Sequence, residues 1–350
     1  MKIEETLLCL CARQELGAVE MERVAALCRH AAVDWDLLFA TSVEHLVAPL
    51  VYHSLQHCAE GAGLSVSAVT LQRFKAAAVE NSIHDKLRRQ KVLAALDYLH
   101  AQRIPVMLVK GIALSALVYQ QPWYTSPEDV DLLLGIPRAK VTPAQRTMLA
   151  SYEQYGIECD AFAHHDLTMN DVLPVDFQRI WCDAQPLGYM GRTVYVMAPE
   201  DLLITLCINS ARKRFFRLKA LCDIAETLRT YPNLDWACTL AKVLDYDVAL
   251  IVYTALYVVQ HCLGVDLPAQ LWRELRVNPL HAAFLRLLCR RMSLTASSDL
   301  RSDGGGKFLG RRVTSSAILR YATLRPYQIG RQLRFMAQTR NGEYEFWDGV

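Results

Sequence analysis

One stretch of the chain, from Val106 to Leu134, most constrains how the sequence can fold. Its pattern predicts a buried strand at Val106–Val109 and then a helix near Ile112–Tyr119. A second apolar strand follows and carries Asp129 and Asp131, whose side chains share one face because they are two residues apart. Two ionised carboxylates on an apolar strand raise the free energy of the folded chain unless a cation lies between them, because they lose water and repel each other. Because oxygen ligands suit Mg²⁺ or Mn²⁺, the stretch predicts a divalent metal site on a small sheet.

The composition sets the limits within which this site has to be built. The chain has 350 residues, a hydrophobic share of 52% and a formal net charge of +2, so it has ample core and no global reason to bind nucleic acid or a membrane. Its 11 cysteines contain no CxxC pair, which argues against a disulfide framework or a thiolate zinc site. Buried, reduced cysteines in a cytoplasmic protein are therefore expected.

No segment of the sequence predicts membrane association. The N-terminus carries Glu4 and Glu5 close behind its lysine and is typical of an amphipathic helix rather than a signal peptide. The most apolar later run, Val248 to Val259, is shorter than the roughly 20 residues that span a bilayer. We expect a cytoplasmic protein with no membrane and no DNA as a partner.

Most of the remaining sequence has helical periodicity. A long helix is expected over Val69–His100, with a possible bend near Asn81, and helices are again expected from Pro199 to about Leu300. Between them, Ile157–Phe162 and Gly188–Met197 predict further strands. The expected fold is α+β: a small mixed sheet with flanking helices and a large C-terminal helical domain. The expected regions are an N-terminal helical region (1–66), an α/β core (67–198) and the C-terminal domain (199–350).

Four segments together resemble a known family. The run from Leu108 to Tyr119, which contains Lys110-Gly111, is followed by the motif DVDLLL; the segments Val33–Leu55 and Ala198–Glu226 complete the pattern. This combination resembles the polymerase-β-like nucleotidyltransferase superfamily and, more narrowly, a bacterial family of uncharacterised nucleotidyltransferases. The resemblance covers roughly residues 30 to 230 and is far more specific than a D-x-D motif alone.

The resemblance implies a two-metal reaction in which a nucleoside monophosphate is transferred from an NTP to a hydroxyl group. Charge develops on both the attacking and the leaving oxygens, and two metal ions about 4 Å apart stabilise both. Asp129 and Asp131 would bind both ions, and a third acid on a later strand would help to deprotonate the acceptor. Asp160 is the predicted third acid, with Asp166 as its nearest competitor.

The expected nucleotide contacts come from two places in the chain. Gly111 lets the backbone approach the phosphates, and Lys110 adds a charge beside them. In the densest basic cluster, Lys213 and Arg217 are expected one helical turn apart, where they would reach the triphosphate; a solvated helix face is the plainer interpretation.

The sequence also departs from the superfamily pattern. Ile112 and Ala113 follow the glycine, where a small hydroxyl residue is usual, and Thr125 stands where the family often has arginine. These differences keep open a second hypothesis, that the chain is a catalytically degenerate nucleotide-binding or regulatory protein. For the enzyme, the acceptor stays open among a small molecule, a peptide or protein and an RNA; a toxin-like enzyme that modifies RNA would bind it in a salt-dependent way.

Three other groups of polar residues are expected to have structural rather than catalytic roles. We expect His164 and His165 to be polar surface residues rather than metal ligands, because no second histidine pair at helical spacing lies nearby. Asp223 is expected to form a salt bridge with Lys219. The arginines of the basic C-terminal tail are expected on a solvated helix.

Overall fold

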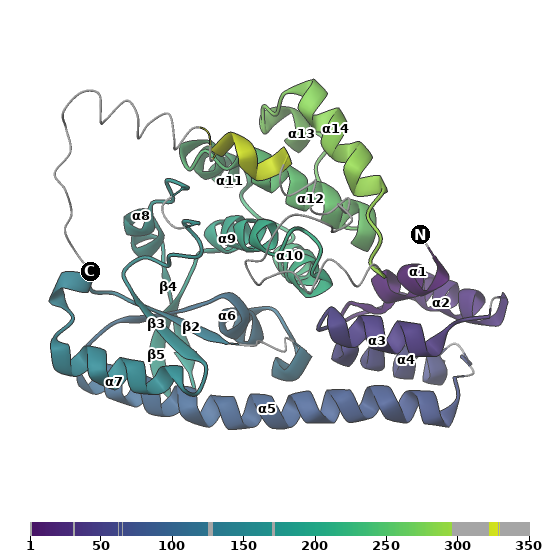
Figure 1. Cartoon of the computed structure of the whole chain (residues 1–350), viewed down its shortest axis with the longest axis horizontal. Coiled ribbons are helices and arrows are strands. Elements are labelled where there is room, and N and C mark those ends of the chain that lie inside the picture. The colour runs from purple at the N-terminus through teal and green to yellow at the C-terminus, as the bar shows by residue number, and fades with distance from the viewer. Residues whose placement is uncertain are drawn as a thin grey trace, which may run out of the picture.

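The computed structural model describes residues 2–30, 32–61, 63–64, 66–124, 129–169, 172–295, 322–327 and 329. Within these residues the fold is α+β, as predicted, with a single five-stranded mixed sheet among many helices (Figure 1). None of the described helices combines the length and the apolar character that crossing a membrane requires. Thr125 and most of the arginine-rich tail lie outside the described residues.

The sheet has the strand order β3-β2-β1-β5-β4, so the first strand in sequence lies at its centre. β1 pairs antiparallel with β2 and parallel with β5, while β3 runs parallel to β2 and β4 antiparallel to β5. The strands are β1 (Val106–Val109), β2 (Val130–Leu134), β3 (Ile157–Ala161), β4 (Gln185–Tyr189) and β5 (Arg192–Val196). All four predicted strand segments are therefore confirmed, and Gly188–Met197 forms parts of two strands.

The two faces of the sheet are covered differently. On one face, Leu108 and Leu132 pack in a buried cluster with Val92 and Leu99 of the long helix α5 (Ala68–Ala101), and α7 (Pro143–Glu153) lies on the same side. On the other face, the side chains of alternate strand residues point toward the C-terminal helices, as Leu133 does. Figure 1 shows α5 and α7 along one side of the sheet and α9 (Pro199–Arg212) on the other.

α5 is continuous over its full length, and the bend considered near Asn81 does not interrupt it. Ser67 caps its N-terminus by accepting a hydrogen bond from the Thr70 N–H, and no proline breaks it. α5 contacts both the N-terminal helices and α7, so one rigid element supports both regions. The N-terminal helices are α1 (Ile3–Cys11), α2 (Ala18–His30), α3 (Trp35–Glu44) and α4 (Ala48–Gly61).

The remaining helices form the C-terminal region and the connections of the sheet. α9 ends at Arg212, and Arg214 and Phe215 follow with left-handed φ values of 62° and 54°. The other helices of the C-terminal region and of the sheet connections are α6 (Lys110–Leu117), α8 (Phe177–Cys182), α10 (Leu218–Thr230), α11 (Trp236–Asp245), α12 (Ala249–Leu263), α13 (Leu271–Glu274) and α14 (Pro279–Arg290). Short 3₁₀ turns lie at Pro122–Tyr124 and Arg138–Lys140.

A buried lysine joins the sheet connection to the C-terminal helices. Lys242 of α11 donates hydrogen bonds to Asp201 of α9 at 2.6 Å and to Asp183, next to α8, at 2.7 Å. The Lys242 and Asp201 side chains are 2% and 0% exposed, whereas Asp183 is 42% exposed. Removal of one partner of a buried ion pair lowers the stability of the fold, because the remaining charge is left buried without a partner.

We therefore expect Lys242→Ala to lower the free energy of unfolding by about 3–5 kcal/mol, since it leaves the Asp201 carboxylate buried without a partner. Urea unfolding at neutral pH measures the change. The matched control is Asp183→Ala, which removes the exposed carboxylate and should change stability by about 0–1 kcal/mol. Equal effects of the two substitutions would contradict this account.

Candidate functional site

The two carboxylates of the D-x-D motif lie at the start of β2, close enough for the charge of Asp131 to act on Asp129. Asp131 is 3% exposed, and Asp129, which immediately precedes the strand, is exposed. Asp131 is paired with Val109 of β1 and with Glu158 of β3. Because residues in register on neighbouring strands share a face, Asp131 and Glu158 point to the same side of the sheet.

Asp131 is stabilised by two donors that meet at the same oxygen. His164 Nε2 and Lys110 Nζ each lie 3.0 Å from its Oδ1. Burial alone raises the pKa of Asp131, but the hydrogen bond from His164 and the charge of Lys110 outweigh it, so the pKa lies below its ordinary value. Asp131 is thus held ionised, and Oδ2 is the oxygen that these donors leave for a ligand.

Lys110 reaches this position from an unusual backbone conformation. It follows β1 directly, begins α6 and has a φ of 53°, in the left-handed region that is costly for a residue with a side chain. Its Nζ bridges Asp131 Oδ1 and Asp166 Oδ2, each at 3.0 Å. Strained non-glycine residues persist where the surrounding structure holds them, which is common at functional sites.

Asp166, the predicted competitor for the third acid, belongs to an ion-pair network instead of standing free. Its Oδ2 also lies 2.5 Å from the guanidinium of Arg212, the last residue of α9. Burial raises the pKa of Asp166, but Lys110 and Arg212 together hold it below its ordinary value. This network connects the loop after β3 to the C-terminal helices.

Two other carboxylates at the site, Asp129 and Glu158, have pKa values above their ordinary values. The pKa of Asp129 is raised by partial desolvation and by the charge of Asp131, and the charges of Lys110 and Lys213 offset only part of this. The pKa of Glu158 is raised by partial desolvation and by Asp131 and Asp129. These raised pKa values reflect the repulsion between negative charges that lie close together. A bound cation would reduce this repulsion.

Asp160 lies two residues further along β3, on the same face as Glu158. Its Oδ2 is 3.1 Å from His165 Nδ1 and 3.3 Å from His164 Nδ1. The expectation that both histidines are plain surface residues is wrong for His164, which is 1% exposed and hydrogen-bonded to Asp131. The chain turns at Phe162, whose φ is 61°, and this turn brings the histidines back to the sheet.

The predicted basic residues fall in different places. Lys213 is the C-cap residue of α9 and lies close enough to Asp129 to lower the pKa of that carboxyl. Arg217 is not on the same helix, so the expected spacing of one helical turn is wrong; its guanidinium donates to the Glu44 carbonyl at 3.1 Å. Its predicted nucleotide contact stays a prediction.

The expected salt bridge between Asp223 and Lys219 is confirmed on α10. The Asp223 carboxylate also accepts a hydrogen bond from the Tyr119 hydroxyl at 2.7 Å, so this buried pair fixes the chain after α6 to α10. Gly111 lies within the first turn of α6, whose N-cap is Val109. Since Val109 pairs with Asp131, the start of α6 lies beside the carboxylates, where its free N–H groups favour an anion.

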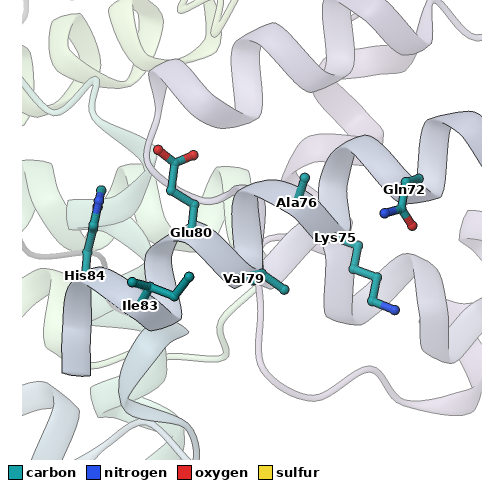
Figure 2. Close-up of a pocket in the computed structure, with 7 residues that line it drawn as sticks. All are labelled: Gln72, Lys75, Ala76, Val79, Glu80, Ile83 and His84. Atoms are coloured by element: carbon teal, nitrogen blue, oxygen red, sulfur yellow. The ribbon is translucent and has the colours of Figure 1, made fainter. Parts of the chain in front are cut away.

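A hollow on the outer side of α5 is an alternative location for a binding site. Figure 2 shows Lys75, Val79 and Ile83 along this hollow, all on one helix. It brings together no cluster of carboxylates from different elements. We therefore place the candidate site where the end of β1 meets the start of β2 and charged groups from several segments converge.

One comparison with known proteins found a match. A family model described as uncharacterised nucleotidyltransferase matches residues 31–264, which is more than half of the chain. The matched range contains the whole sheet and each of the charged residues described above. No curated protein and no solved structure matches the chain.

The strain of the left-handed backbone at residue 110 can be tested by substitution. Glycine adopts a left-handed conformation freely, whereas alanine costs roughly 1–2 kcal/mol there. Both Lys110→Gly and Lys110→Ala remove the ammonium, so we expect the glycine variant to be the more stable of the two by about 1 kcal/mol in urea unfolding. At the exposed helical residue Lys86 the order should reverse by a similar amount. If the alanine variant is at least as stable as the glycine variant at residue 110, strain at Lys110 is excluded.

Proposed function

Because the chain belongs to the uncharacterised nucleotidyltransferase family, we propose that it transfers a nucleoside monophosphate from an NTP to a hydroxyl group and releases pyrophosphate. The acceptor is a small molecule, a peptide or protein, or an RNA. The observation that carries this proposal is the group of three carboxylates at the start of β2 and the adjoining part of β3. Asp131 is held ionised there, and Asp129 and Glu158 have raised pKa values beside it.

The oxygen chemistry of these side chains suits a divalent metal ion. All three ligands are carboxylate oxygens, which suit Mg²⁺ or Mn²⁺, and both contacts of Asp131 use Oδ1. When bound, such ions polarise the phosphate and stabilise the charge that develops on the attacking and leaving oxygens. Asp129, Asp131 and Glu158 would hold them. Asp160, predicted first as the third acid, has its Oδ2 beside both histidines, whereas Glu158 is in register with Asp131.

Side chains and backbone groups of the protein would bind the triphosphate, accept the proton of the acceptor hydroxyl and hold Asp131 in position. Lys213 and the start of α6 would supply positive charge to the triphosphate. The raised pKa of Glu158 makes its carboxylate a better proton acceptor, so it would take the proton of the acceptor hydroxyl. His164 and Lys110 keep Asp131 ionised and fixed in position.

One observation favours a second candidate function. The ammonium of Lys110 already bridges Asp131 and Asp166, where it supplies part of the positive charge that the carboxylates require. A protein in which this ammonium permanently replaces a metal ion would be a nucleotide-binding or regulatory module without catalysis. The two functions differ in whether nucleotide binding requires a divalent metal.

We expect wild-type protein to bind at least one NTP in the presence of Mg²⁺ or Mn²⁺, and the Asp129→Ala/Asp131→Ala double variant to lose this binding. Isothermal titration calorimetry with each of the four NTPs, with and without metal, measures it. Asp235→Ala is a matched control, because Asp235 is a carboxylate that caps α11 away from the sheet. Binding that is independent of metal would favour the regulatory module, and absence of binding to every NTP would contradict both functions.

The choice between Glu158 and Asp160 is tested by the pH dependence of metal binding. A raised pKa means that a proton competes with the metal as the pH falls, so the affinity for Mn²⁺ should decrease by up to about tenfold per pH unit for each proton displaced. Mn²⁺ titrations followed by electron paramagnetic resonance measure this affinity. We expect Glu158→Gln to weaken Mn²⁺ binding and flatten its pH dependence, and Asp160→Asn to leave both nearly unchanged. The opposite pattern would return Asp160 to the third position.

A further inference from the structure

The loop after β3 brings three potential metal ligands together. Asp160 at the end of β3 and His164 and His165 in the loop each offer one ligand atom, and these atoms all lie within 4.8 Å of one another. Asp160 Oδ2 lies 3.3 Å from His164 Nδ1 and 3.1 Å from His165 Nδ1. In a tetrahedral site with bonds of about 2.05 Å, neighbouring ligand atoms are about 3.3 Å apart. Two of the three separations therefore already match such a site.

The outer nitrogens of both histidines face carboxylates. His164 Nε2 is 3.0 Å from Asp131 Oδ1, and His165 Nε2 is 3.5 Å from Asp166 Oδ1. Histidine ligands of metals typically donate their second N–H to a carboxylate, which fixes the ring and its tautomer. The Asp166 N–H donates to His164 Nδ1 at 3.2 Å, so that nitrogen carries a lone pair and Nε2 carries the hydrogen. A metal ion would take this lone pair in place of the backbone N–H.

The loop is also fixed and accessible in the way that a metal site needs. The Leu167 N–H donates to the His164 carbonyl, and the Thr168 hydroxyl donates to the His165 carbonyl, both at 3.0 Å. His164 is 1% exposed, whereas the side chain of His165 is 57% exposed and that of Asp160 28%. One ligand is thus anchored in the core, and the other two leave a path from the solvent.

We propose that Asp160, His164 and His165 bind a divalent ion of the zinc class, separate from the carboxylate site of the proposed function. Two imidazole nitrogens and one carboxylate oxygen favour Zn²⁺ or Co²⁺ over Mg²⁺, which prefers oxygen ligands alone. Three protein ligands leave the fourth position for water or a bound group. The ion ties the loop to β3 and holds His164 in the orientation in which it donates to Asp131.

The test uses the full chain and Co²⁺, whose visible absorption reports a four-coordinate site, with Zn²⁺ added as competitor. We expect one Co²⁺ per chain, displaced by Zn²⁺ and unaffected by excess Mg²⁺. The exposed Cys182 is replaced by serine throughout, so that its thiol does not contribute. His165→Ala and Asp160→Asn should each weaken binding by more than about 100-fold, because loss of a direct ligand exceeds the 10–100-fold effect of outer partners. Both residues are partly exposed, so these variants test the site without disturbing the core.

The chain offers a matched control in its other close histidine pair. His53 and His57 of α4 have parallel rings with centroids 6.4 Å apart, but among the described residues they belong to no group of three potential metal ligands. His57→Ala should leave the Co²⁺ spectrum unchanged, and so should Asp129→Asn, which removes a ligand of the proposed magnesium site. The inference is overturned if no Co²⁺ spectrum develops, if His165→Ala retains wild-type affinity, or if His57→Ala abolishes binding. Each of these readouts is independent of whether any NTP binds.

Discussion

The buried charge of Asp131 is the constraint on which the site depends. A carboxylate that is 3% exposed is tolerated only when donors replace the water that it has lost. Here His164 and Lys110 supply these donors, and both converge on one oxygen. The position of the loop after β3 and the strained backbone at the start of α6 both follow from this requirement, because each brings one donor to the carboxylate.

The two faces of the sheet divide structural and chemical roles. The face toward α5 is apolar, and the side chains of Leu108 and Leu132 are fully buried there. The opposite face carries Asp131, Glu158 and Asp160 near the strand ends, and basic residues of the C-terminal helices reach it. A strand gives each face alternate residues, so a single short strand serves both the core and the charged site.

The two proposed cation sites are close neighbours on the charged face. Asp129, Asp131 and Glu158 present oxygen atoms only, whereas Asp160 is accompanied by two imidazoles. His164 connects them, because one of its nitrogens faces Asp131 and the other faces Asp160. The ligand types separate hard from borderline ions, so the two proposals are chemically distinct although their residues are close neighbours.

The sequence by itself determined the local elements and the D-x-D pair, because hydrophobic periodicity, capping residues and alternation act over a few residues. The strands and the long α5 were predictable in this way. Only the tertiary structure decided which distant groups meet Asp131. His164 is 33 positions away, and the bridge from Lys110 to Asp166 spans 56. Such contacts depend on strand register and on turns like that at Phe162, which short-range patterns do not encode.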